Sequence, residues 1–175
     1  MMSCRSFCLV VDALLVSTST GAGSELPTPL AYWKLDDGKD GNAAEANDGS
    51  PLPVSESGEI AQDDRRGGVF HFQQGEGIPL PDAVLGKLTD TLTVSMWLKP
   101  NWFHLAVTFG EWVQVHVDGK LIGSRIVDPS AMSPGASPYP ASMRFMENET
   151  GGPLDEVRIF NRVLSENEIR ALAAP

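Results

Sequence analysis

Three alternating runs, separated by two tight-turn signals, lie between residues 101 and 127, and they constrain the fold more than any other feature. The segment reads NWFHLAVTFGEWVQVHVDGKLIGSRIV, with Gly110-Glu111 and Asp118-Gly119 between the runs. Gly-X suits a type II′ turn and Asp-Gly a type I′ turn, and both turns match the twist of the strands that they join. The pattern therefore predicts an antiparallel meander.

Short strand patterns also occur on both sides of this meander. They are predicted at 31–35, 68–72, 91–99, 143–147 and 154–160, with a Pro-flanked edge segment at 77–81. The stretches 36–58 and 128–142 between them consist mainly of turn-forming residues and are expected to be surface loops. About eight short strands with one convincing helix predict an all-β fold, an antiparallel β-sandwich.

The one helix is predicted at the C-terminus. Ser165 precedes Glu168 by three residues, which is the spacing of a capping box, and Leu164 and Ile169 fit a hydrophobic staple. A helix of about two turns is too short to be stable alone in water. We therefore expect it to dock on the sheets.

Length and charge limit the domain count and the classes of partner. The chain has 175 residues, which fits one domain, and its net charge of −10 with only 13 Lys and Arg argues against nucleic-acid binding. Residues 1–22 resemble a secretory signal, with an apolar run of ten residues that is too short to span a bilayer. We expect a secreted or cell-surface protein with a linker at 23–30 and one β-sandwich domain at 31–175.

Both cysteines fall inside the predicted signal. Cys4 and Cys8 would be lost on cleavage, so the mature domain is expected to have no disulfide and no zinc-thiolate site.

Asp155 is the most unusual side chain of the closing strand. Simple alternation places it on one face with Val157 and Ile159, at the edge of the core. A carboxylate there needs a dedicated partner. Three alternatives remain open: a structural hydrogen bond to a neighbouring turn, ligation of calcium, and simple exposure.

Successive motifs in this sequence resemble those of a known family. The motifs are AYWKLDDG, NDG, GGVFHF, LTVSMWLKP, WFHLAVTF, VHVDGKLIGS and PLDEVRIFNRVLSENEI. In this order, from about Ala31 to Leu172, they resemble the LamG-like (laminin G type 3) domains, which are jelly-roll sandwiches of the concanavalin A-like lectin/glucanase superfamily.

The sequence departs from this family at one junction. The resemblance implies about two strands between the WLKP and WFHLAV motifs, but here Pro100 directly precedes Asn101 and Trp102. We therefore expect a sandwich that lacks one internal hairpin and leaves a sheet edge unpaired.

The resemblance also implies a calcium site between the loop after the first strand and the closing strand. Calcium prefers hard oxygen ligands. By motif position the candidates are Asp36, Asp37, Asp48 and Asp155, with Asn47 as a further donor. The competing interpretation is a solvated acidic loop without a metal.

No pattern predicts catalysis. The E-x-D-x-E carboxylates of glucanase relatives are absent, and alternation would point Asp155 and Glu156 to opposite faces, so that they could not act as a pair. His71, His104 and His116 lie within strand patterns and are expected to be structural. Nucleophile-elbow, P-loop and dinucleotide motifs are also absent.

We therefore expect a non-catalytic secreted recognition module that binds carbohydrate or protein ligands, with calcium as an assisting ion. Aromatic side chains near loops could stack on sugars, although large aromatic side chains more often fill cores. The candidates are Trp97, Trp102, Trp112, Tyr32 and Tyr139. The alternatives are an accessory β-sandwich domain of a larger surface protein without its own ligand, and a polysaccharide hydrolase.

Overall fold

The computed structural model describes seven segments of the chain. They comprise residues 26–39, 42–45, 52–53, 58–72, 78–126, 144–145 and 152–174. The predicted signal at 1–22 and Tyr139 lie outside these segments.

Twelve strands and two short helices make up the described part. The strands are β1 (Ala31–Lys39), β2 (Asn42–Glu45), β3 (Leu52–Pro53), β4 (Glu59–Asp63), β5 (Gly67–Phe72), β6 (Ile78–Pro79), β7 (Leu92–Leu98), β8 (Phe103–Phe109), β9 (Trp112–Val117), β10 (Lys120–Ile126), β11 (Arg144–Phe145) and β12 (Gly152–Phe160). The helices are α1 (Asp82–Leu85) and α2 (Glu166–Leu172). The predicted all-β, antiparallel sandwich class is confirmed.

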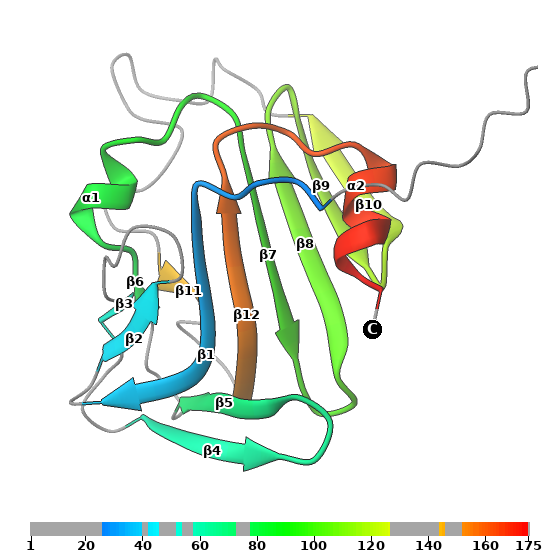
Figure 1. Ribbon diagram of the computed structural model, residues 1–175. Coiled ribbons are helices and arrows are strands. Elements are labelled where there is room, and N and C mark those ends of the chain that lie inside the picture. The colour runs from blue at the N-terminus through cyan, green and yellow to red at the C-terminus, as the bar shows by residue number, and fades with distance from the viewer. Residues whose placement is uncertain are drawn as a thin grey trace, which may run out of the picture.

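The main sheet has the strand order β10-β9-β8-β7-β12-β1-β2-β3, and the β4-β5 hairpin joins it through the pairing of β5 with β12 (Figure 1). A second sheet consists of β6 and β11. The closing strand β12 lies between β7 and β1, so segments from the two ends of the chain meet in the middle of the sheet.

The predicted meander forms β8, β9 and β10. Asp118 and Gly119 both have positive φ angles, 48° and 74°, as the type I′ turn requires. The type II′ prediction for Gly110-Glu111 is wrong, because Gly110 is not among the described glycines with positive φ. The last registered pair of β8 and β9 joins Thr108 to Gln114, so five residues separate the last paired positions, which is more than a two-residue turn leaves.

The junction between the WLKP and WFHLAV motifs forms a hairpin. β7 and β8 pair over seven residues, from Leu92 opposite Phe109 to Leu98 opposite Phe103, and only four residues connect them. Among the described strands, no strand is inserted between the two motifs.

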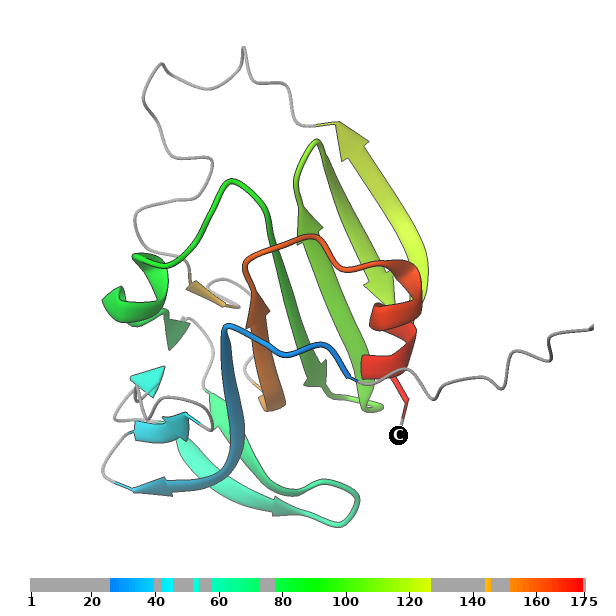
Figure 2. The same ribbon diagram turned by 45° about the horizontal axis from the view of Figure 1, so that its top comes forward.

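Each face of the main sheet has its own apolar cluster. The larger cluster covers one face and combines Trp33, Val94 and Val157 with Val84 of α1. The smaller cluster lies on the opposite face, where Ala106 and Phe160 contact Ile169 of α2. Figure 2 shows α2 lying over the meander and α1 beside the short strands at the other end of the sheet.

The cap of α2 confirms the sequence prediction. The Ser165 hydroxyl accepts from the Glu168 N–H, and the Glu168 carboxylate accepts from the Ser165 N–H at 2.8 Å, so both halves of the capping box are present. Leu164 and Ile169 are buried together in the smaller cluster. A cap of this kind contributes about 1 kcal/mol to helix stability.

The region 36–58 is less irregular than predicted. β1 continues to Lys39, and β2 and β3 lie within the stretch that was expected to be loop only. No sequence pattern predicted β4 and α1. These elements are short, and short elements give weak periodic signals.

Candidate ligand-binding site

A β-bulge in β12 places Asp155 on the face opposite the one that alternation predicts. Asp155 pairs with Trp97 and Arg158 pairs with Ser95, and the register shifts between these two pairs. Glu156, within the bulge, has a φ angle of 50°. The bulge turns Asp155 away from Val157, so the prediction that these two residues share a face is wrong.

Asp155 has the dedicated partner that its burial requires. The Arg66 Nε donates to the Asp155 Oδ2, and the Asp155 Oδ1 accepts from the Glu156 N–H at 2.9 Å. Arg66 lies in the turn between β4 and β5, so the partner comes from a neighbouring turn. Burial raises the pKa of Asp155 to about 6, although the Arg66 hydrogen bond opposes this effect.

Glu156 binds the same arginine. The Arg66 Nη2 lies 3.0 Å from the Glu156 Oε2. The prediction that Asp155 and Glu156 point to opposite faces is therefore wrong, because the bulge brings both carboxylates to one guanidinium. An arginine that bridges two carboxylates in this way has little rotational freedom.

A second arginine extends this network toward β1. The Arg158 Nη2 lies 3.0 Å from the Glu156 Oε2 and donates to the Tyr32 hydroxyl at 3.2 Å. Burial is the main reason why the pKa of Tyr32 rises to about 12. We call Tyr32, Arg66, Asp155, Glu156 and Arg158 the charged cluster.

Two tryptophans flank Arg66. The Arg66 Cζ lies 4.3 Å from the ring centroid of Trp97 and 5.6 Å from that of Trp102. Both distances fall within the range of cation–π attraction. His104 makes an edge-on ring contact with Trp97, with 5.4 Å between the ring centroids. Burial lowers the pKa of His104 to about 4.

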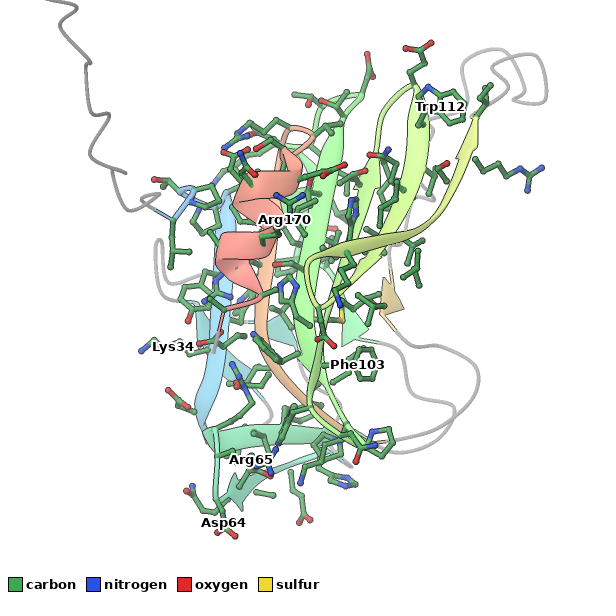
Figure 3. The ribbon with its side chains drawn as sticks, turned by 90° about the vertical axis from the view of Figure 1, so that its right-hand side faces the viewer. Lys34, Asp64, Arg65, Phe103, Trp112 and Arg170 are labelled. Atoms are coloured by element: carbon green, nitrogen blue, oxygen red, sulfur yellow. The ribbon has the colours of Figure 1, made fainter. Side chains whose placement is uncertain are left out.

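A pocket of about 310 Å³ lies beside the charged cluster, at one rim of the sheet. We call it the rim pocket, and its lining residues are Asp63, Asp64, Arg65, Lys99, Pro100, Asn101 and Trp102. The lining combines the turn after β4 with the connection between β7 and β8. Figure 3 shows Asp64 and Arg65 at the end of the molecule where the β4-β5 hairpin lies.

Asp63 holds the rim pocket together. Its Oδ2 lies 2.6 Å from the Lys99 Nζ, and its Oδ1 accepts from the Trp102 Nε1 at 3.0 Å and from the Arg66 N–H at 3.2 Å. The hydrogen bond from Lys99 lowers the pKa of Asp63 to about 2, so the carboxylate is ionised at neutral pH. One side chain thus joins the β4-β5 hairpin to the connection between β7 and β8.

Trp102 has an unusual backbone conformation at this position. Its φ angle is 26°, a region that non-glycine residues rarely occupy. Strained backbone of this kind clusters at binding and catalytic sites. The hydrogen bond to Asp63 and the nearby cations fix the indole at the wall of the rim pocket.

The structure separates the tryptophans that the sequence grouped together. Trp97 is buried against Arg66, Trp112 is 43% exposed on β9, and Trp102 lines the rim pocket. No sequence pattern predicted the other pocket residues. The one signal that could have indicated them was the unusual junction at Pro100 and Asn101.

The four predicted calcium ligands are only partly described. Asp36 is exposed, while the side chain of Asp37 and the whole of Asp48 lie outside the described part. Both oxygens of Asp155 accept from protein donors, so calcium would bind there only by displacing Arg66. Within the described residues, no three acidic, His or Cys side chains form a metal-binding group. The calcium site therefore stays a prediction.

A calcium titration tests this prediction. Calcium bound by the folded chain is expected to stabilise it by about 2.7 kcal/mol at a hundred times the dissociation constant, which raises the midpoint of thermal unfolding. A chelator should reverse the shift, and Asp48→Asn should reduce it. An unchanged midpoint at millimolar calcium would contradict the predicted site.

Neither of the two helices in the described part has the length and apolar character needed to cross a bilayer.

Comparison with protein families confirms the resemblance over part of the chain. Residues 101–170 match the model of the laminin G type 3 family, described as the concanavalin A-like lectin/glucanases superfamily. This segment contains the meander, the closing strand and most of α2. No curated protein sequence matches the chain.

Solved structures show the same fold at low sequence identity. A Trypanosoma rangeli sialidase in complex with 2,3-difluorosialic acid is 14% identical, with a TM-score of 0.59 over 92% of this chain and 35% of the sialidase chain. The HCR/D W1238A mutant is 9% identical, with a TM-score of 0.55 over 83% of this chain and 52% of that chain. The chain thus spans between a third and a half of these proteins, and the likeness concerns the fold alone.

Proposed function

We propose that this chain is a secreted, non-catalytic recognition module whose rim pocket binds a carbohydrate. The observation that carries the proposal is Trp102, which is held in a strained backbone conformation at the wall of a polar pocket. Sandwich domains commonly place their binding residues on loops at a rim, where a rigid sheet positions them.

The chemistry of the rim pocket supports a carbohydrate ligand. Asp64, Arg65 and Asn101 are exposed and offer acceptors and donors for hydroxyl groups, while Trp102 supplies an apolar ring. The volume of the rim pocket is at the small end of the range for ligand pockets, so the pocket fits a short part of a ligand. The family match to lectin- and glucanase-like domains supports the same ligand class.

The arrangement of carboxylates supports binding without catalysis. Asp155 and Glu156 converge, but both are bound to Arg66, and Asp63 is bound to Lys99. A general acid needs a free carboxyl group close to the scissile bond. We expect no release of reducing sugar from polysaccharides. Release that disappears in Glu156→Gln would support the hydrolase alternative instead.

Two tryptophan variants test the binding site. Across a panel of neutral and acidic oligosaccharides, Trp102→Ala is expected to weaken the best binder by about 2 kcal/mol, or ~30-fold, because it removes a central aromatic contact. Trp112→Ala removes an exposed tryptophan far from the pocket and should bind normally. Isothermal titration calorimetry measures both affinities.

A second variant guards against misfolding of the first. Asn101→Ala changes an exposed side chain of the rim pocket and is expected to weaken the same ligand while leaving the circular dichroism spectrum unchanged. Equal affinities in wild type, Asn101→Ala and Trp102→Ala would place the ligand elsewhere. If no oligosaccharide binds, the accessory-domain alternative is favoured.

A further inference from the structure

Arg66 lies outside the lining of the rim pocket, yet it contacts the tryptophan of that pocket. The Arg66 Cζ lies 5.6 Å from the ring centroid of Trp102. The backbone N–H of Arg66 donates to the Asp63 carboxylate, which also accepts from the Trp102 indole N–H. One residue therefore acts on Trp102 through its ring face and through its hydrogen-bond partner.

The other side of Arg66 is fixed by the sheet. Asp155 and Glu156 of β12 bind its guanidinium, and Trp97 of β7 lies against it at 4.3 Å. These contacts come from two central strands, and the Arg66 side chain is only 15% exposed. Arg66 thus connects the rigid middle of the sheet to the wall of the pocket.

We propose that Arg66 is the positioning residue of the rim pocket, holding the Trp102 indole in the orientation that receives the ligand. A side chain that is already ordered loses less conformational entropy on binding, and this preorganisation increases affinity. The inference deepens the proposed function and rests on it for the identity of the ligand. The positioning itself does not require a ligand.

Lysine is the informative replacement. It keeps the positive charge and can pair with Asp155, but it lacks the planar fork that reaches both carboxylates while lying against two rings. If Arg66 served only as an ion-pair partner, the Arg66→Lys variant would keep both the wild-type midpoint of thermal unfolding and the wild-type surroundings of Trp102. If Arg66 positions Trp102, the variant keeps the wild-type midpoint, but the surroundings of Trp102 change.

Fluorine NMR of protein labelled with 5-fluorotryptophan reads out the surroundings of Trp102 without any ligand. The chain has four tryptophans, and Trp102→Phe assigns the relevant resonance. Arg66→Lys is expected to shift and broaden the Trp102 line and to leave the Trp112 line unchanged. Arg65→Lys, at the adjacent pocket residue, is the matched control and should leave the Trp102 line in place.

A double variant covers the case in which a single change destabilises the fold. Arg66→Met with Asp155→Asn removes the cation together with its buried carboxylate partner, and it should displace the Trp102 line as well. A Trp102 line that keeps its wild-type shift and width in both Arg66 variants would overturn the proposal. So would a disturbance of equal size in the Arg65→Lys control.

Affinity measurements with an oligosaccharide distinguish a failure of this inference from a failure of the proposed function. With the oligosaccharide that binds best to wild type, Arg66→Lys is expected to reduce affinity about tenfold, the size of one cation–π contact in a partly desolvated site. Unchanged affinity together with a shifted Trp102 line would overturn the proposal. If no oligosaccharide binds, the proposed function fails, and the fluorine spectrum alone decides whether Arg66 positions Trp102.

Discussion

Gly68→Ala is expected to lower the free energy of unfolding by about 3 kcal/mol or more, at the upper end of the range for overpacking. A Cβ at this position would lie 2.3 Å from the Asp36 carbonyl oxygen and 2.5 Å from the Asp36 Cα. Both atoms belong to the backbone of β1, so no side-chain rotation can relieve the clash. Urea denaturation followed by circular dichroism measures the loss.

Gly123→Ala provides the matched control within a strand. A Cβ built on Gly123 meets no atom within 4 Å, and β10 is exposed along its whole length. The alanine should leave stability unchanged or raise it by up to about 1 kcal/mol, because glycine is unfavourable inside strands. If the two variants unfold at the same urea concentration, the close contact between β5 and β1 is not present in solution.

Arg66→Met should cost about 3–5 kcal/mol of stability. Asp155 is 2% exposed, and removing its cation leaves a buried carboxylate without a charged partner. Methionine keeps most of the apolar contact with Trp97, so the loss of stability comes mainly from removing the positive charge of Arg66. The measurement is again the free energy of unfolding in urea at pH 7.

Arg65→Met is the control for this prediction. Arg65 is the exposed neighbour of Arg66 in the same turn, and its substitution should change stability by less than about 0.5 kcal/mol. Adding Asp155→Asn to Arg66→Met should recover part of the loss, because a neutral amide is easier to bury than an unpaired carboxylate. A stable Arg66→Met protein would contradict the prediction, because Asp155 would then have to be hydrated or protonated in solution.

Most features encoded by neighbouring residues were predicted correctly, with the turn at Gly110-Glu111 as an exception. The capping box depends on Ser165 and Glu168, three positions apart, and the type I′ turn depends on Asp118 and Gly119. The strands of the meander also follow from local alternation. In each case the residues that determine the structure lie within one turn of each other or within one strand pair.

Features decided by distant contacts were missed. Alternation cannot indicate that Glu156 leaves the extended conformation, because the cause is nonlocal: β12 pairs with β7, β5 and β1, and Glu156 binds Arg66. Arg66 and Asp155 are 89 positions apart in the chain. The bulge, the charged cluster and most of the rim pocket therefore required the structure.

The connection between β7 and β8 is short, so the rim pocket is expected to open only when the sheet unfolds. Only four residues connect these two long strands, and they include the pocket residues Lys99, Asn101 and Trp102. Openings of low free energy normally begin in long, weakly anchored segments. This binding surface should consequently persist until the whole sheet melts, and amide exchange near Trp102 should proceed only through global unfolding.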